Sequence, residues 1–389
     1  MPFHEVTKMD QRRELARLAA APGANLSALA RAFGVDRKTV YKWRDRALEA
    51  SAFAERARTP LRQPTRTDPA IEAAVLALRA RHPSWGGRKL RAALARAGTA
   101  APAASTITEI LRRHGVEIGA FGGGAAPFQR FEHDAPNDLW QMDFKGHVAM
   151  RDGARLHPLT VLDDHSRFCI VLGACADERT DTVKTHLIKA FRAYGRPRTI
   201  LCDNGAPWGD GPGSPFTPLG VWLIEHDVRV AHARPYHPQT MGKDERFHRT
   251  LKLELLRRQS FAAVPQAARA FVQWRELYNT ARPHEALNNA VPAERYNPSR
   301  RAFRAHVSPF DYPHAALIRR VQQGGRLWLQ GRWMRVPKAF RGKDVALLET
   351  ETDGLYAVRF RHVEIARLDI KTGKRHPPKL STMSPNDCG

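Results

Sequence analysis

The stretch LWQMDFKGHVAM, residues 139 to 150, decides the fold of the central part of this 389-residue chain. Its mixture of apolar and polar side chains is typical of a β-strand with one buried face. Two similar stretches follow after short turns, LHPLTVLDDHSR from residue 156 and FCIVLGACA from residue 168. Because tight turns join consecutive antiparallel strands, the sequence predicts a three-stranded meander that begins at residue 139.

The elements after this meander extend it into a layered α/β domain. In chain order they are a helix (180–195), a strand (198–205), a helical segment after Pro218, a strand (228–235) and a long helix from about residue 243. The order βββαβαβα matches a ribonuclease H-like fold, a mixed sheet with helices on both faces. We therefore predict a ribonuclease H-like catalytic core over residues 134–298.

The N-terminal residues 1–50 carry two helical patterns around a turn, in NLSALARAFGVDRKTVYKWRDRAL. Gly34 interrupts the first pattern and Asp36 can cap the second. This arrangement resembles a helix-turn-helix, although a plain helical hairpin has the same pattern. The basic second helix supplies the residues predicted to contact DNA, which are Arg37, Lys38, Thr39, Lys42 and Arg44.

A second helical unit is predicted over residues 70–118, between a Pro-containing linker at 51–69 and a Gly-rich linker at 119–133. It has helix-turn-helix proportions, with Arg88 and Lys89 predicted to contact DNA, and a structural bundle is the alternative.

The C-terminal part has two predicted segments. Short strands over residues 315–370 predict a small β-barrel. The polar residues 371–389 predict a disordered tail.

The charge of the chain indicates its partner. The formal net charge is +24 and the sequence pI is near 10.6. Basic residues recur in every segment, which favours nucleic acid over an anionic lipid surface or a role in solubility alone. No apolar run is long enough for a membrane span and no apolar leader is recognisable, so we expect a cytoplasmic protein without membrane contact. The four cysteines form no C-x-x-C pair, which favours neither a disulfide frame nor zinc.

Two acids lie at strand positions that suit a catalytic site. Asp143 interrupts an apolar strand, where an acid needs a cationic partner or a metal to remain ionised. Asp203 follows the strand TILC and opens the turn D-N-G, at the strand end where α/β sheets bind ligands, although a turn-forming role is equally open. The competing acids Asp163 and Asp164 lie between two meander strands, which favours turn and capping roles.

Two neighbouring acids, Asp244 and Glu245, lie at the start of the helix predicted from residue 243. At about 100° per residue, Asp244 falls on the apolar side and Glu245 on the opposite side, in line with Arg249 and Lys252. An outward acid followed by two cations suits a metal site beside a phosphate backbone, although an ordinary Glu–Arg helix pair has the same spacing. Asp244 is expected only to stabilise the helix through its dipole.

The motifs together resemble those of one family. W-x-M-D-F, L-C-D-N-G and Y-H-P-Q-x-x-G-K-x-E-R-x-H-x-x-L-K resemble the insertion-sequence transposases of the retroviral-integrase superfamily, the D,D,E recombinases. The resemblance also covers the helix-turn-helix front, a Y-N-x-x-R-P-H stretch at 278–284 and the C-terminal β-domain. The second and third acids are further apart than is usual in the family, and the additional residues fall in the Gly/Pro segment PWGDGPGSPFTP.

The resemblance implies a set of site residues and a chemistry. Asp143, Asp203 and Glu245 would be the catalytic carboxylates and would bind Mg²⁺ or Mn²⁺, with two ions expected, while Arg249 and Lys252 would contact DNA. The implied function is a transposase that binds the element's terminal inverted repeats and performs DNA cleavage and strand transfer. Its partners would be the repeats, target DNA and further copies of the chain in a homo-oligomer on DNA, near the bacterial nucleoid. A silent DNA-binding regulator and a metal-dependent nuclease without strand transfer are the alternatives.

Overall fold

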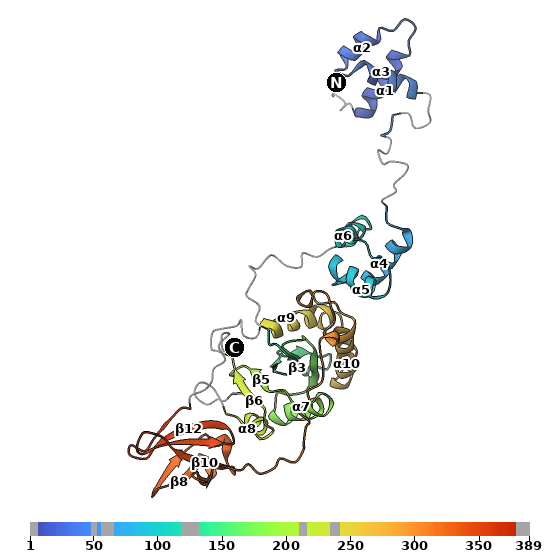
Figure 1. Cartoon of the computed structure of the whole chain (residues 1–389). Coiled ribbons are helices and arrows are strands. Elements are labelled where there is room, and N and C mark those ends of the chain that lie inside the picture. The colour runs from blue at the N-terminus through green and yellow to red at the C-terminus, as the bar shows by residue number, and fades with distance from the viewer. Residues whose placement is uncertain are drawn as a thin grey trace. The chain divides into compact units, whose positions relative to one another are not determined.

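The computed structural model describes residues 7–47, 53–55, 66–117, 132–209, 216–233 and 242–378. The chain divides into two compact units, Met1–Arg66 and Thr67–Gly389, and both are drawn in Figure 1. Within the described ranges, no helix combines the length and the apolar character that crossing a membrane requires.

The first unit is a small helical domain. Its described helices are α1 (Lys8–Ala19), α2 (Leu26–Ala32) and α3 (Arg37–Arg46). Gly34 has a φ of +61°, a left-handed conformation that suits the turn between α2 and α3. The Asp36 side chain accepts the Lys38 N–H at 2.7 Å and caps α3. Val40 and Trp43 face the core, so the polar side of α3 is left for solvent, as the helix-turn-helix pattern predicts.

The second unit begins with another group of helices, α4 (Pro69–Arg81), α5 (Gly87–Arg96) and α6 (Ala104–Arg113). Leu90 and Ile107 are fully buried in their shared core. The α4–α5 turn is bonded to the rest of the unit, because Ser84 Oγ donates to Glu254 Oε1 at 3.0 Å. The same oxygen accepts from Arg282 Nε at 3.0 Å, in an ion pair with both side chains buried.

A mixed sheet forms the middle of the second unit. Its strands are β1 (Leu139–Phe144), β2 (Val148–Ala149), β3 (Arg155–Asp163), β4 (Cys169–Cys175), β5 (Thr199–Cys202) and β6 (Arg229–His232). The order is β2-β3-β1-β5-β6, with β4 also paired to β3. The meander β1, β3 and β4 is antiparallel, as predicted, whereas β1, β5 and β6 run parallel.

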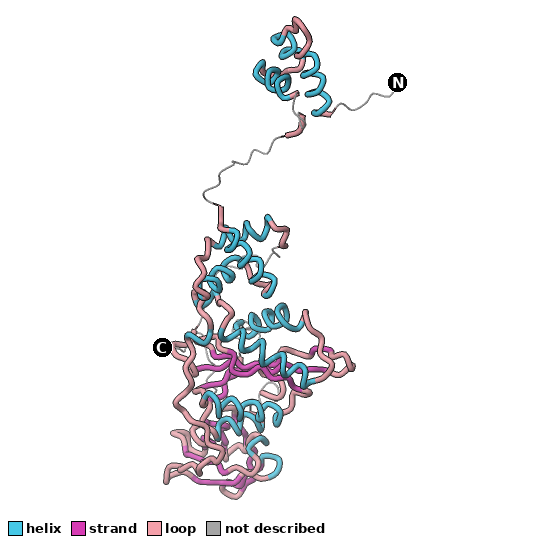
Figure 2. Tube along the Cα trace, turned by 90° about the vertical axis from the view of Figure 1, so that its right-hand side faces the viewer, coloured by secondary structure: helices cyan, strands magenta, loops and turns pink. Residues whose placement is uncertain are grey.

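Helices cover both faces of this sheet, which Figure 2 shows as cyan coils on either side of the magenta strands. One face packs against α7 (Thr180–Tyr194) and α8 (Pro218–Glu225). The other face packs against α9 (Gly242–Leu251), the π-helical turn η2 (Lys252–Leu256) and α10 (Val264–Thr280). The layered α/β architecture predicted for the centre of the chain is confirmed.

The C-terminal domain differs from the predicted small barrel over 315–370. Its strands are β7 (Leu317–Arg320), β8 (Arg326–Leu329), β9 (Arg332–Arg335), β10 (Asp344–Glu349), β11 (Leu355–Phe360), β12 (Val363–Asp369) and β13 (Lys374–His376). The described residues form an open sheet, β13-β12-β11-β10-β7, and a separate hairpin, β8-β9. The barrel is not closed because β8 and β9 hydrogen-bond to each other and pack on the sheet through side chains such as Leu327 and Met334.

The tail predicted to be disordered over 371–389 is partly ordered. Lys374–His376 form β13, which pairs with the edge of β12 through Arg367 and His376. The pairing satisfies backbone groups that composition alone does not reveal. Residues 379–389 lie outside the described part of the chain.

Candidate active site

Asp143 and Asp203 lie at neighbouring ends of two parallel strands. The β1–β5 register pairs Gln141 with Leu201, and the same register continued by two residues leads to Asp143 and Asp203. Burial and, to a smaller extent, the nearby negative charge of Asp203 together raise the pKa of Asp143 to about 7. The sheet therefore holds two carboxylates close enough for their charges to interact.

Glu245 lies on the first turn of α9, exposed to solvent. Arg249 and Lys252 are exposed on the same stretch, as the helical spacing predicts. Among the described side chains, however, no group of three His, Cys, Asp or Glu residues has the spacing of a metal site. The structure thus brings Asp143 and Asp203 together and does not bring Glu245 into a cluster with them.

Asp244 is the more deeply placed of the two neighbouring acids, with none of its surface exposed. The burial predicted from helical periodicity is confirmed, but the predicted interaction of a charged Asp244 with the helix dipole is not. Burial raises the pKa of Asp244 well above its usual value, and the charges of Asp143 and Asp164 raise it further. Both carboxyl oxygens lack a hydrogen-bond partner within the described structure. A neutral acid at this position is what these surroundings favour.

His248 connects α9 to the strands beside Asp143. Thr160 Oγ1 donates to the Asp143 carbonyl oxygen at 3.0 Å, so the His248 Nε2–H donates to Thr160 at 2.8 Å. The lone pair of the neutral ring is then on Nδ1, 3.9 Å from Asp143 Oδ2. Burial lowers the pKa of His248 to about 4, so the contact is not an ion pair at neutral pH. His248 belongs to the motif E-R-x-H, but its contact with Thr160 could not be predicted from that motif.

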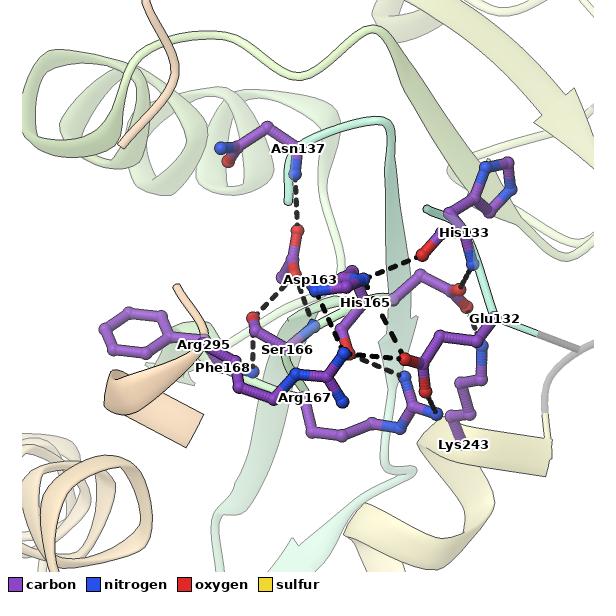
Figure 3. A network of polar contacts seen from close by, with 11 residues as sticks. Glu132, His133, Asn137, Asp163, His165, Ser166, Arg167, Phe168, Lys243 and Arg295 are labelled. Atoms are coloured by element: carbon purple, nitrogen blue, oxygen red, sulfur yellow. Dashed lines mark hydrogen bonds and ion pairs between the residues drawn. The ribbon is translucent and has the colours of Figure 1, made fainter. Parts of the chain in front are cut away.

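A polar network fixes the start of α9 against the β3–β4 turn (Figure 3). Lys243 forms an ion pair with Asp164, whose side chain is 1% exposed. Asp164 also accepts the His133 N–H at 2.9 Å and the Gln141 Nε2–H at 2.8 Å. Because Lys243 precedes Glu245 by two residues, this ion pair sets where the first turn of α9 lies.

The neighbouring Asp163 completes the turn from β3 to β4. Its side chain accepts from the Asn137 N–H at 2.7 Å and from the Ser166 N–H at 2.8 Å. Arg167, in the same turn, donates to Glu132 at 2.7 Å. The turn role predicted for Asp163 is confirmed by these hydrogen bonds, whereas Asp164 accepts hydrogen bonds from distant segments instead of capping the turn.

The residues predicted to contact DNA differ in how accessible they are. Arg37, Lys38 and Lys42 are exposed on α3, while Thr39 and Arg44 are half-buried there. The Arg44 guanidinium forms an ion pair with Asp45 at 2.8 Å.

The two cations predicted on α5 lie close to the rest of the second unit. Arg88 is exposed and 3.8 Å from Glu285. Lys89 is half-buried, and burial, with a smaller effect of Arg282, lowers its pKa to about 8. Less of Lys89 is available to a phosphate than the sequence suggests, because α5 faces the core at this point.

Several families match the chain in sequence. Residues 133–238 and 226–292 each match a family described as Integrase core domain. Residues 316–376 match the C-terminal domain of the IS481 family transposases, and residues 7–52 and 39–111 match Homeodomain-like domains. By these matches, the chain has an integrase core domain preceded by Homeodomain-like domains and followed by a domain similar to the C-terminal domain of IS481 family transposases.

Two relatives of the chain are proteins of bacterial insertion elements. An uncharacterized 31.7 kDa protein of insertion element IS407 from Burkholderia multivorans is 28% identical over 160 residues, 41% of this chain and 55% of the relative. An uncharacterized 39.2 kDa protein of IS476 from Xanthomonas euvesicatoria is 28% identical over 159 residues, 41% of this chain and 44% of the relative. The chain thus spans about half the length of these relatives.

A solved structure of a viral integrase domain was also found by comparison. The catalytic core domain of HTLV-2 integrase, in complex with magnesium, is 14% identical. The likeness spans 42% of this chain and 97% of the viral domain, with a TM-score of 0.33.

Proposed function

We propose that this chain is a DNA transposase that binds the terminal repeats of an insertion sequence, cuts DNA at its ends and joins those ends to target DNA. The observation that carries the proposal is the pair Asp143 and Asp203, at adjacent ends of β1 and β5 in an integrase core. The exposed cations Arg249 and Lys252 follow on the helix that starts at this edge, where they would bind the phosphate backbone of DNA.

The donors at this edge fit a divalent metal. Asp143 and Asp203 offer oxygen ligands and a local excess of negative charge, the combination that suits Mg²⁺ or Mn²⁺. Glu245 is the proposed third ligand, and it would reach the pair by a movement of its side chain while the ion pair of Lys243 with Asp164 holds the first turn of α9 in place. Bound divalent ions would supply activation of the attacking oxygen and stabilisation of the leaving oxygen at these carboxylates.

The chemistry consists of two phosphoryl displacements. In the first, a water oxygen forms a bond to phosphorus, the bond to the 3′ oxygen breaks, and that oxygen takes up a proton. In the second, the freed 3′-hydroxyl oxygen forms the new bond to a target phosphorus, and the target's own 3′ oxygen leaves. No protein side chain becomes covalently attached in either step. The residues of α3 and α5 would hold the repeats, and two ends require more than one copy of the chain.

Metal dependence is the experiment that tests this proposal. Full-length protein with a duplex that carries the element's own ends should cleave it in Mg²⁺ or Mn²⁺, because the carboxylates need the cation to act. Ca²⁺ should support binding of the ends with little turnover. Gel analysis of products with each cation gives the result. Cleavage that continues undiminished in excess chelator would contradict a metal-dependent mechanism, and binding without cleavage in every cation would indicate a silent regulator.

A further inference from the structure

The β8–β9 hairpin presents two tryptophans to solvent. Trp328 is 47% exposed and Trp333 is 55% exposed. They are cross-strand partners, with ring centroids 5.1 Å apart in an edge-to-face arrangement. Side chains of this size are usually buried, so a paired exposure of two of them indicates a binding surface.

The hairpin is built so that these rings cannot turn inward. Leu327, Leu329 and Met334 occupy the opposite face and are buried in the domain core. The two residues of its turn, Gln330 and Gly331, both have a positive φ. Two-residue turns of this kind match the twist of the two strands in a tight hairpin. A register shift that would bury the tryptophans would also expose the three apolar side chains.

The charge around the tryptophans indicates the partner. Arg326 and Arg335 lie directly opposite each other on the same face of the hairpin, and both are exposed. Like charges in a cross-strand pair are destabilising, and within the described structure neither arginine has an acidic partner. Residues 317–343 contain eight Arg and Lys side chains and no Asp or Glu. This surface therefore fits an anion, and it disfavours a second copy of a chain with a net charge of +24.

We propose that the tryptophan face, defined as Arg326, Trp328, Trp333 and Arg335, binds single-stranded DNA by stacking unpaired bases on the indole rings. Aromatic rings stack with any base, whereas the bases of an intact duplex have no free faces to offer. The two arginines are placed to contact the phosphates on either side. This site is separate from the helix-turn-helix units and from the carboxylates, and binding there requires neither metal nor cleavage.

The test measures the affinity of the full-length protein, in the presence of a chelator, for two labelled DNA molecules of equal length. One is a single-stranded thymidine oligonucleotide and the other is a duplex of unrelated sequence. Trp328→Ala/Trp333→Ala should weaken single-strand binding by about tenfold or more, since each stacked base contributes on that order, and duplex binding by less than about twofold. Trp328→Tyr/Trp333→Tyr should restore most of the affinity because it keeps aromatic faces. Trp328→Leu/Trp333→Leu should not.

The arginines give an independent readout. Arg326→Gln/Arg335→Gln should lower the slope of log affinity against log salt by roughly 1.4 for the single strand, as expected for two lost phosphate contacts. Thermal midpoints of all variants should stay close to that of the wild type, because the substituted side chains are exposed. Equal losses for single strand and duplex would overturn the proposal, as would unchanged single-strand binding. Unchanged DNA binding with an altered oligomeric state would instead show that the face is a protein interface.

Discussion

Replacement of Glu245 by Gln should lower DNA cleavage and strand joining by orders of magnitude. The amide keeps the shape of the side chain but removes the negative charge that a metal ligand needs. Binding of the element's ends should survive, because Glu245 is exposed on the first turn of α9 and its replacement keeps the shape of the side chain. Gel-based cleavage and joining assays, together with a mobility-shift assay for the ends, separate these two effects.

The matched control is the neighbouring substitution Asp244→Asn. Asp244 is fully buried and favours its neutral form, so an amide of the same shape should leave catalysis close to that of the wild type. A loss of catalysis in Asp244→Asn would also be informative, because Asp244 lies close enough to Asp143 for their charges to interact. If Asp244→Asn abolished catalysis while Glu245→Gln stayed active, Asp244 would be the third ligand.

Replacement of Lys243 by Met should reduce both stability and catalysis. It leaves the buried carboxylate of Asp164 without its cation, a change that costs about 3 to 5 kcal/mol of unfolding free energy when a buried pair is broken. The hydrogen bonds from His133 and Gln141 remain, so the lower end of that range is expected. A displacement of Glu245 by about 1 Å would lower the rate by about 100-fold. Denaturant unfolding and cleavage assays measure the two effects.

A double variant separates the positioning role of Lys243 from its effect on stability. Lys243→Met/Asp164→Asn leaves no unpaired charge, so most of the lost stability should return, while catalysis should stay low because α9 is no longer tied to the β3–β4 turn. Lys189→Met, at an exposed lysine of α7, serves as the control for stability and should have no effect. Full recovery of catalysis in the double variant would show that Lys243 does not position Glu245.

The parts of the fold and site that depend on local patterns could be predicted from the sequence. Asp143 and Asp203 were recognisable because each interrupts or ends an apolar strand, and parallel pairing of β1 with β5 brings such positions together. The burial of Asp244 and the exposure of Glu245 follow from the 3.6-residue period of a helix. Each of these residues could be recognised from the pattern of the element that carries it.

The features that could not be predicted depend on contacts between distant segments. His248 and Thr160 meet only because α9 packs on β1 and β3, and the Lys243–Asp164 pair joins residues that are far apart in the chain. The open C-terminal sheet depends on which edges β8 and β9 pair with, which strand patterns do not specify. Lys89 was predicted to be an exposed cation, but it is half-buried, because helical periodicity alone does not show which residues of α5 pack against the rest of the unit.

The most direct test of the proposed function asks whether a DNA 3′-hydroxyl is the attacking group in the joining step. Two pre-cut duplexes with the element's ends are compared in Mg²⁺ with a supercoiled target, one ending in a 3′-hydroxyl and the other in a 3′-hydrogen. A transposase should join the first to the target and leave the second unjoined, because only the first offers an attacking oxygen. Target cutting that is equal with both ends, with no joined product, would contradict strand transfer and identify a nuclease.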